Sequence, residues 1–148
     1  HMEEIDLCWR LKRIGYKILC CPESTVFHVG GGTLPNNNPK KLFLNYRNNL
    51  FLLYKNLPSN KLIRIIGFRI ILDITSSILY LLKPSVRFTF AVFKAHLSFL
   101  FSIPKMYKKR KELMKLVKVK DGMNIYPKSI LKMFFFKQIN NFHQLNMD

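Results

Sequence analysis

Three carboxylates near the start of the chain, Glu3, Glu4 and Asp6, are the first side chains that could do chemistry. They open a segment whose apolar residues recur at helical spacing. Acidic residues in a first helical turn stabilise the helix through its dipole, and this effect alone can account for them. A carboxylate held at the start of a helix can also act as a general base when it faces a cleft. The residue types and their spacing leave both interpretations open.

A histidine and a run of glycines form the second candidate group. His28 ends an apolar segment and is followed by Gly30, Gly31 and Gly32. A lone histidine at the end of a strand is more often structural than a ligand, but glycines let the backbone approach a bound molecule closely. The run is not a P-loop, because the Lys-Ser/Thr pair of that motif is missing. Gly31 and Gly32 are therefore candidate contacts for a bound cofactor, and His28 is a candidate site residue.

The secondary structure around these residues can be predicted from the spacing of apolar residues and the positions of glycine and proline. Residues 3–14 have the spacing of an amphipathic helix, which Gly15 is expected to end. Residues 16–21 and 24–29 are rich in β-branched and aromatic residues and predict one broken strand or two short ones. Residues 30–39 hold three glycines, two prolines and three asparagines, which predicts a loop.

From Pro39 onward the sequence predicts helices almost to its end. Pro84 and Pro104 are expected to end two of them, because proline lacks the amide hydrogen that an α-helix needs. The expected segments are helices over about 39–57, 61–83 and 85–103, a basic helix over 105–118, a turn over 120–127 and an aromatic-rich helix over 128–142.

The composition combines a strong positive charge with a high apolar content. The 148 residues include 25 Lys and Arg against 8 Asp and Glu, a formal net charge of +17, and 49% of the residues are hydrophobic. This apolar and aromatic content excludes a disordered tail. The charge indicates nucleic acid, an anionic membrane face or a phosphate-bearing substrate as a partner. The three cysteines, none of them in a CxxC, indicate neither a disulfide framework nor a zinc site.

Residues 62–82 form an apolar run about long enough to cross a bilayer, which takes roughly 20 residues. Arg64, Arg69 and Asp73 would then lie inside the membrane, at a cost of about 2.5–3.5 kcal/mol each near its centre. Asp73 follows Arg69 by four residues, so the two can pair on one helical face. We therefore expect helices that lie in the membrane interface, with lysines on anionic headgroups, rather than spanning helices. The core of an ordinary helical bundle is the other interpretation.

Taken together, residues 3–33 resemble the end of the catalytic domain in family 2 glycosyltransferases, GT-A enzymes that include rhamnosyltransferase-like members. The family pattern there is an acidic pair, Asp-Leu, an arginine in the helix, Gly-Tyr, Pro-Glu, and an apolar-x-His ending followed by Gly and Ser/Thr. The matching positions are Glu3-Glu4, Asp6-Leu7, Arg10, Gly15-Tyr16, Pro22-Glu23, Val26-Phe27-His28, Gly31 and Thr33. The resemblance is tightest over residues 3–58, and the rest of the chain looks like the C-terminal extension of bacterial members.

The resemblance implies roles for individual residues. Glu4, the second member of the acidic pair, would be the catalytic base. The family more often has Asp at this place, and Asp6 is the alternative base. Glu3 would steady the acceptor or the start of the helix. His28 matches a histidine that joins the divalent metal, Mg²⁺ or Mn²⁺, holding the nucleotide diphosphate, and neutral imidazole is a suitable ligand for such an ion.

The resemblance also implies that this chain is a C-terminal fragment. The nucleotide-binding half of the family, with its Asp-x-Asp metal motif, would precede residue 1, so the chain alone is expected to be inactive. The expected fold is a mostly helical α/β fragment. Residues 1–38 would be the end of a Rossmann-like GT-A domain, with a helix and short strands, and residues 39–148 a basic helical extension that associates with a membrane.

The function that follows from the resemblance is sugar transfer with inversion. The full-length enzyme would move a sugar from a nucleotide-diphosphate sugar to a lipid-linked or polysaccharide acceptor in cell-surface glycan synthesis. It would be peripheral on the cytoplasmic face of the bacterial plasma membrane. The alternative is a non-enzymatic basic helical module that binds a membrane or nucleic acid. Nucleic acid is disfavoured, because long aliphatic runs interrupt the basic residues and no nucleic-acid fold signature is present.

Overall fold

The computed structural model describes residues 2–27, 35, 37–82, 85–119 and 128–145. Across these ranges the chain forms five α-helices and one short 3-10 helix, η1, and contains no strand. The helices are α1 (Glu3–Ile14), α2 (Pro39–Asn56), α3 (Ser59–Leu82), α4 (Val86–Leu116) and α5 (Ile130–Lys137), followed by η1 (Phe142–Gln144). The predicted helical part of the fold is confirmed.

The predicted β component is wrong for the residues that the structure describes. Residues 16–27, which cover the first predicted strand and most of the second, form no strand. Leu19 is 87% exposed and Phe27 97% exposed, so these side chains do not pack as they would in a sheet. A strand is stable only when a neighbouring strand takes its backbone hydrogen bonds, and no other described segment supplies one. Composition alone could not reveal the absence of that neighbour. His28 and Val29, the end of the second predicted strand, lie outside the described residues.

Helix α1 begins and ends as its sequence predicts. Its acidic residues lie in the first turn and Lys12 and Arg13 in the last, which suits the helix dipole. Gly15 has a φ of 102°, in the left-handed region that favours glycine. The Gly15 amide donates to the Lys12 carbonyl and the Tyr16 amide to the Leu11 carbonyl, both at 3.0 Å. This pair of hydrogen bonds is a Schellman motif, so the predicted end of the helix at Gly15 is confirmed.

Helices α2 and α3 also follow the predicted segments. The Asn38 side chain caps the start of α2 by accepting a hydrogen bond of 2.8 Å from the Lys40 amide, and Pro39 occupies the first helical position. Leu57, which precedes Pro58, is extended and ends the helix. Helix α3 then runs from Ser59 to Leu82.

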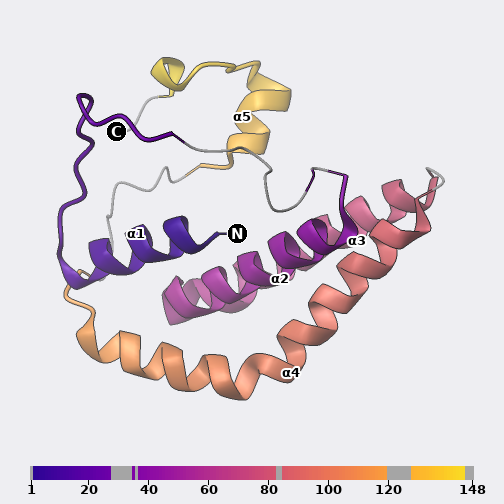
Figure 1. Cartoon of the computed structure of the whole chain (residues 1–148), viewed down its shortest axis with the longest axis horizontal. Coiled ribbons are helices and arrows are strands. Elements are labelled where there is room, and N and C mark those ends of the chain that lie inside the picture. Colours follow the sequence, from indigo (N-terminus) through magenta and orange to yellow (C-terminus); the bar gives the residue numbers. More distant parts are fainter. Residues whose placement is uncertain (1, 28–34, 36, 83–84, 120–127, 146–148) are drawn as a thin grey trace.

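Helix α4 does not end at Pro104 as predicted. It continues through this proline for 31 residues in all, so the predicted apolar and basic helices are one element, and Figure 1 shows that α4 is bent along its length. Proline removes one helical hydrogen bond and bends a helix, but tertiary contacts can hold the helix on both sides of it. Met106, Arg110 and Leu113 are buried and hold the second half of α4 against its neighbours.

The remaining predicted segments are only partly described. Helix α5 covers residues 130–137, which is shorter than the predicted 128–142. The predicted turn over 120–127 lies outside the described residues, as does most of the loop predicted over 30–39.

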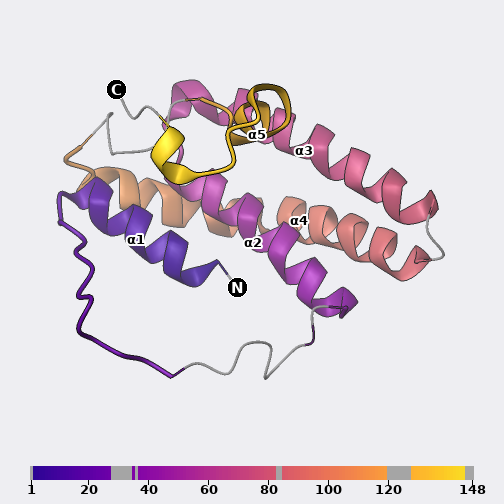
Figure 2. The same cartoon turned by 90° about the horizontal axis from the view of Figure 1, so that it is seen from above.

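Helices α2, α3 and α4 form the core of the protein. The packing of α2 against α4 is the most extensive, and α3 contacts both of them. A cluster of Tyr46, Val92 and Ala95 is buried at their centre, and Phe99 contacts the rings of Phe51 and Tyr54 at 6.0 and 5.9 Å between centroids. Helix α1 lies beside α2, as Figures 1 and 2 show from two directions.

Candidate active site at the start of helix α1

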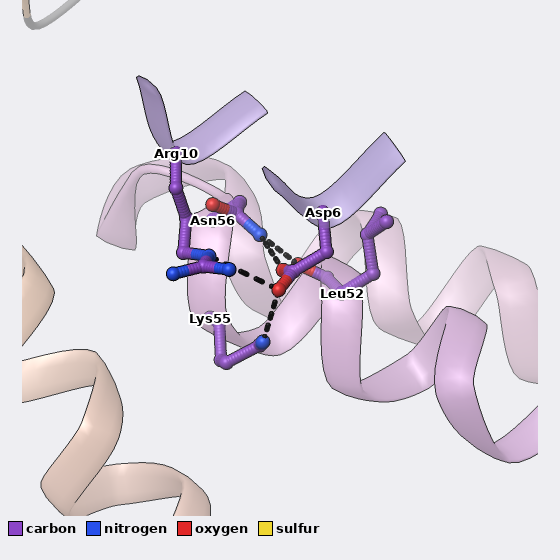
Figure 3. Close-up of polar contacts among 5 residues, drawn as sticks. All are labelled: Asp6, Arg10, Leu52, Lys55 and Asn56. Atoms are coloured by element: carbon purple, nitrogen blue, oxygen red, sulfur yellow. Dashed lines mark hydrogen bonds and ion pairs between the residues drawn. The ribbon is translucent and has the colours of Figure 1, made fainter. Parts of the chain in front are cut away.

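Asp6 fastens α1 to the end of α2. Its Oδ2 atom lies 2.6 Å from Lys55 Nζ and 3.1 Å from Arg10 Nε, and its Oδ1 atom accepts a hydrogen bond of 2.8 Å from Asn56 Nδ2 (Figure 3). Asn56 is fully buried, and its Nδ2 also donates to the Leu52 carbonyl at 3.0 Å. Both carboxylate oxygens of Asp6 are therefore engaged by cations or an amide.

The pKa of Asp6 is lowered from its ordinary value of 3.8. Burial alone would raise this pKa, but the hydrogen bonds from Lys55 and Asn56, with the charges of Lys55 and Arg10, outweigh the burial. A carboxylate whose anionic form is so stabilised is a weak base at neutral pH. This arrangement makes Asp6 better suited to positioning α1 than to accepting a proton from an acceptor.

Arg13 makes the second connection between α1 and the rest of the protein. Its side chain is only 4% exposed, and its Nη1 donates to the Asn56 carbonyl at the end of α2. Its Nη2 lies 3.5 Å from the sulfur of Met114 in α4. The Arg13 carbonyl in turn accepts hydrogen bonds from the amides of Lys118 and Val119, at 3.0 and 3.2 Å. Helix α1 is thus held by the ends of both α2 and α4.

Arg110 of α4 completes the contacts at the end of α2. Its Nη1 donates to the Tyr54 carbonyl and its Nη2 to Ser59 Oγ at 3.1 Å, with the guanidinium 5.8 Å from the centroid of the Tyr54 ring. Carbonyls in the last turn of a helix lack helical partners and carry partial negative charge. Arg13 and Arg110 satisfy two of them, which stabilises the place where α1, α2 and α4 meet.

The two glutamates of the acidic pair remain on the surface. Glu3 and Glu4 are exposed in the first turn of α1. Glu3 borders a hollow of about 190 Å³ together with Met2, Asp6, Asn48, Phe51, Leu52 and Lys55, whereas Glu4 does not line it. The structure thus places Glu3, Glu4 and Asp6 on one rigid helix, with only Asp6 directed into the protein.

The other predicted site residues lie outside the described part of the chain. His28, Gly31 and Gly32 are among these, so the predicted convergence of Glu4 and His28 on one cleft stays a prediction. Sequence reasoning did not identify Arg13, Lys55 and Asn56 as residues that hold the site. The one available signal was the four-residue spacing of Asp6 and Arg10, which is typical of a helical ion pair.

A second polar cluster lies between α3 and α4. The predicted pairing of Arg69 with Asp73 is confirmed, with 2.8 Å between Arg69 Nε and Asp73 Oδ1. The other oxygen, Asp73 Oδ2, lies 3.3 Å from His96 Nε2, and His96 Nδ1 lies 2.9 Å from the Val92 carbonyl. Asp73 is only 1% exposed, and the Arg69 guanidinium stacks over the Tyr46 ring at 5.4 Å.

This environment raises the pKa of His96 above its ordinary value of 6.5. The interaction with Asp73 is the main cause, and it outweighs burial and the charge of Arg69, which both act in the opposite direction. The Asp73 carboxylate beside Nε2 and the Val92 carbonyl beside Nδ1 both favour the protonated form of the imidazole. The cluster is a buried ion pair with a histidine beside it.

No group of three metal-ligating side chains is formed by the described residues. The carboxylate best placed inside the protein, that of Asp6, is already bound by Lys55, Arg10 and Asn56. The described residues therefore do not form a site for the divalent metal that the resemblance implies. In comparisons with known proteins, no family model, curated protein or solved structure matches this chain.

Proposed function

We propose that the chain is the C-terminal part of an inverting glycosyltransferase that uses a nucleotide-diphosphate sugar. The observation that carries the proposal is the arrangement of the acidic residues of α1. The carboxylate of Asp6 is bound by Lys55, Arg10 and Asn56. Glu4 is exposed in the first turn of the same helix, which these contacts hold in place. A general base needs a rigid support and an accessible carboxylate, and Glu4 has both. The order of motifs from Glu3 to Thr33 supports the same family.

In this proposal Glu4 accepts the proton of the acceptor hydroxyl. The acceptor oxygen forms a bond to the anomeric carbon while the bond from that carbon to the nucleotide diphosphate breaks, so the configuration is inverted. Glu3 borders the hollow beside Asp6 and orients the acceptor or the start of the helix. Asp6 acts as a positioning residue through its contacts with α2.

The metal and nucleotide parts of the proposal rest on the resemblance alone. His28 would join Mg²⁺ or Mn²⁺ at the diphosphate, and Gly31 and Gly32 would contact the donor. The described residues do not themselves form a metal site. The remaining ligands would come from an Asp-x-Asp motif encoded upstream of His1, and the present chain alone would be inactive.

The proposed place of action is the cytoplasmic face of the bacterial plasma membrane, with a lipid-linked or polysaccharide acceptor. A formal net charge of +17 favours an anionic surface. Large apolar side chains exposed along α3 and α4, such as Phe68, Ile78, Phe90 and Phe101, favour contact with lipid. Peripheral attachment would bring the site close to an acceptor held in the membrane.

The transferase proposal is tested in the enzyme that includes the sequence encoded upstream of His1. Glu4→Gln should lower the turnover of a nucleotide sugar by about 10²- to 10⁴-fold, the usual contribution of a general base. The matched control is Glu112→Gln on the exposed surface of α4, which should keep full activity. Full activity of the Glu4→Gln enzyme would contradict the assignment of the base. Transfer by the 148-residue chain alone, with Mg²⁺ or Mn²⁺, would contradict the proposal that a nucleotide-binding half encoded upstream of His1 is needed.

A non-enzymatic membrane-binding module is the second candidate function. Nucleic acid is bound by stacking on its bases and by positive charge on its phosphates. Many of the exposed apolar side chains of α3 and α4 are aliphatic and can do neither, so they favour a membrane as the partner. A DNA mobility shift at physiological salt would favour nucleic acid. Vesicle binding together with the absence of an upstream Asp-x-Asp motif would favour the membrane module over the transferase.

A further inference from the structure

Helices α3 and α4 each carry an exposed stripe of apolar side chains. On α3 the uncovered residues from position 67 onward are uncharged, and they are Gly67, Phe68, Ile71, Ile74, Thr75, Ile78, Leu79, Leu81 and Leu82. On the first half of α4 the stripe follows helical spacing and consists of Val86, Phe90, Phe93, Leu97, Leu100 and Phe101. Proteins that remain free in water rarely leave apolar surface of this kind uncovered.

The two stripes lie on the same side of the molecule. A groove of about 390 Å³ runs between α3 and α4, and exposed side chains of both stripes line it, including Ile74, Ile78, Leu81, Phe93 and Leu100. The opposite sides of the two helices face α2, where Val92 and Ala95 are buried with Tyr46. We call this shared apolar surface, formed by the two stripes and the groove, the outer face.

The ionisable groups in the middle of α3 and α4 pair with one another, and of these His96 lines the groove between the two helices. Asp73, the one acidic residue of α3, is 1% exposed and pairs with Arg69 and His96. Charged groups in lipid-embedded helices are expected to point inward and to pair in this way. If the exposed side of α3 simply faced water, an acidic residue such as Asp73 could lie on that side.

Three hydroxyl groups beside the outer face donate to backbone carbonyls. Thr75 Oγ1 donates to the Ile71 carbonyl and Ser76 Oγ to the Leu72 carbonyl, both at 3.0 Å, and Thr89 Oγ1 donates to the Ser77 carbonyl at 3.2 Å. Thr75 matters most, because it is exposed within the α3 stripe. In hydrocarbon a polar group must find its partner inside the protein, and here each of these hydroxyls has one.

Basic side chains surround the outer face. Exposed positive charges lie near the start of α3 at Arg64, beside the α4 stripe at Arg87 and Lys94, and beyond it at Lys105 and Lys108. This placement suits an apolar surface in lipid with anionic headgroups around its edge. The charge complementarity favours an anionic bilayer over an apolar protein partner.

The depth of insertion is limited by α2. Helices α3 and α4 are each long and apolar enough to cross a membrane, judged by length and composition. However, α2 covers their other side and carries Arg47, Asn48, Asn49 and Lys55. Such a helix cannot itself lie in hydrocarbon without a large cost. The arrangement therefore favours a shallow position, with α3 and α4 in the acyl-chain boundary and α2 on the water side.

We propose that the outer face of α3 and α4 is embedded in the acyl-chain boundary of an anionic bilayer. This inference rests on the membrane attachment proposed above and not on the transferase chemistry. It assigns the contact to one face, and it states that side chains such as Ile78 and Phe93 enter hydrocarbon while α1 remains outside it.

The test measures the depth of single tryptophans in vesicles. Trp9 of α1 is the one native tryptophan, so Ile78→Trp and Phe93→Trp are each made with Trp9→Phe. Each protein is mixed with phosphatidylglycerol–phosphatidylcholine vesicles whose acyl chains carry bromine, which quenches nearby tryptophan. Fluorescence at positions 78 and 93 should be quenched, whereas native Trp9 should not. Binding without quenching at positions 78 and 93 would overturn the proposal and indicate contact with headgroups only.

A matched pair of charge changes separates insertion from electrostatic attraction. Ile78→Glu and Lys109→Gln each lower the net charge by one, but only the first lies on the outer face. Ile78→Glu should weaken vesicle binding by about tenfold or more, because a charged group is costly in hydrocarbon. Lys109→Gln should weaken it much less, and Thr75→Val should leave it unchanged. Equal weakening by Ile78→Glu and Lys109→Gln would contradict insertion.

Two further outcomes are distinguishable. If the outer face is instead covered by a second copy of the chain, the protein should form a dimer without vesicles, Ile78→Glu should dissociate it, and the proposal would be overturned. Glycosyl transfer to a water-soluble acceptor is measured separately and does not require the outer face. Transfer by the unaltered protein without vesicle binding would contradict this inference alone. Vesicle binding with quenching at positions 78 and 93, but without transfer, would contradict the transferase alone.

Discussion

Arg13 of α1 and Arg110 of α4 each donate a hydrogen bond to a main-chain carbonyl near the end of α2, at Asn56 and Tyr54 respectively. Both guanidinium groups are largely buried, at 4% and 7% exposure for the two residues. Guanidinium suits this place because it keeps its charge and can serve two acceptors at once. The C-terminal end of α2 is therefore the point to which α1 and α4 are attached.

Arg110→Lys should destabilise the protein although it keeps the positive charge. A lysine ammonium is a single point of donation and cannot reproduce the fork that reaches both the Tyr54 carbonyl and Ser59 Oγ. We expect the free energy of unfolding to fall by about 1–3 kcal/mol, the usual cost of leaving a buried acceptor unsatisfied. Urea denaturation followed by circular dichroism measures the change. The control is Lys109→Gln at the exposed neighbouring position, and an equal loss in both variants would contradict the role of Arg110.

Asp6→Asn should loosen the attachment of α1 to α2. The amide removes the charge that faces Lys55 and Arg10, and we expect a loss of about 1–3 kcal/mol in the free energy of unfolding. Because the pKa of Asp6 is lowered in the folded protein, its contribution is present above the ordinary pKa of 3.8 and is lost as the pH falls through the folded value. The difference in stability between the wild type and the variant should therefore be full above about pH 4 and should shrink as the pH falls below that value. Identical acid unfolding curves for both proteins would count against this anchor.

His96 should make stability depend on pH in the opposite direction. Its pKa is raised in the folded state, so its contribution is fully present below the ordinary value of 6.5 and is lost as the pH rises through the folded value. The groups in contact with the imidazole are the Asp73 carboxylate and the Val92 carbonyl, and the nearby Arg69 charge opposes its protonation. Denaturation between pH 6 and pH 9 should show this loss for the wild type. The loss should be smaller in Asp73→Asn, and an unchanged pH slope in that variant would contradict the pairing.

Two glycines should respond to alanine in opposite directions. Gly67 lies inside α3, and a Cβ atom there would meet nothing within 4 Å. Gly67→Ala should raise the free energy of unfolding by about 0.5–1 kcal/mol, because glycine is a poor helix former. Gly15 has a φ of 102°, so Gly15→Ala should lower stability by about 1–2 kcal/mol through backbone strain. Thermal unfolding of the two variants measures the contrast, and a gain for both would show that α1 does not end as described.

Local signals predicted the helices of this fold well. Apolar spacing, the acidic first turn and Gly15 predicted α1, and the stop at Leu57-Pro58 predicted the end of α2. The pairing of Arg69 with Asp73 also follows from spacing alone. These features depend on residues within a few positions of one another, which a sequence displays directly.

The errors arose where distant parts of the chain decide the structure. A strand over residues 16–21 needs a neighbour, and the continuation of α4 through Pro104 depends on contacts made by Arg110 with α2. For the candidate site, the sequence predicted that the acidic pair opens a helix. It could not predict that Asp6 is bound by Lys55 and Asn56, which lie 49 and 50 positions away. Pairings at such separations follow from the packing of helices and not from a local motif.

The unbroken course of α4 has a mechanical consequence for the proposed enzyme. Along the bent course of α4, Phe93 lies in the first half and Met114, the neighbour of Arg13, lies near the last turn. The two residues are separated by about 32 Å of helix at 1.5 Å per residue. If the first half of α4 lies among acyl chains, the contact between Met114 and Arg13 sets the height of the acidic first turn of α1 above the membrane surface. The enzyme would then prefer acceptors whose hydroxyl group lies at the matching distance from the membrane surface, and α4 would set that distance.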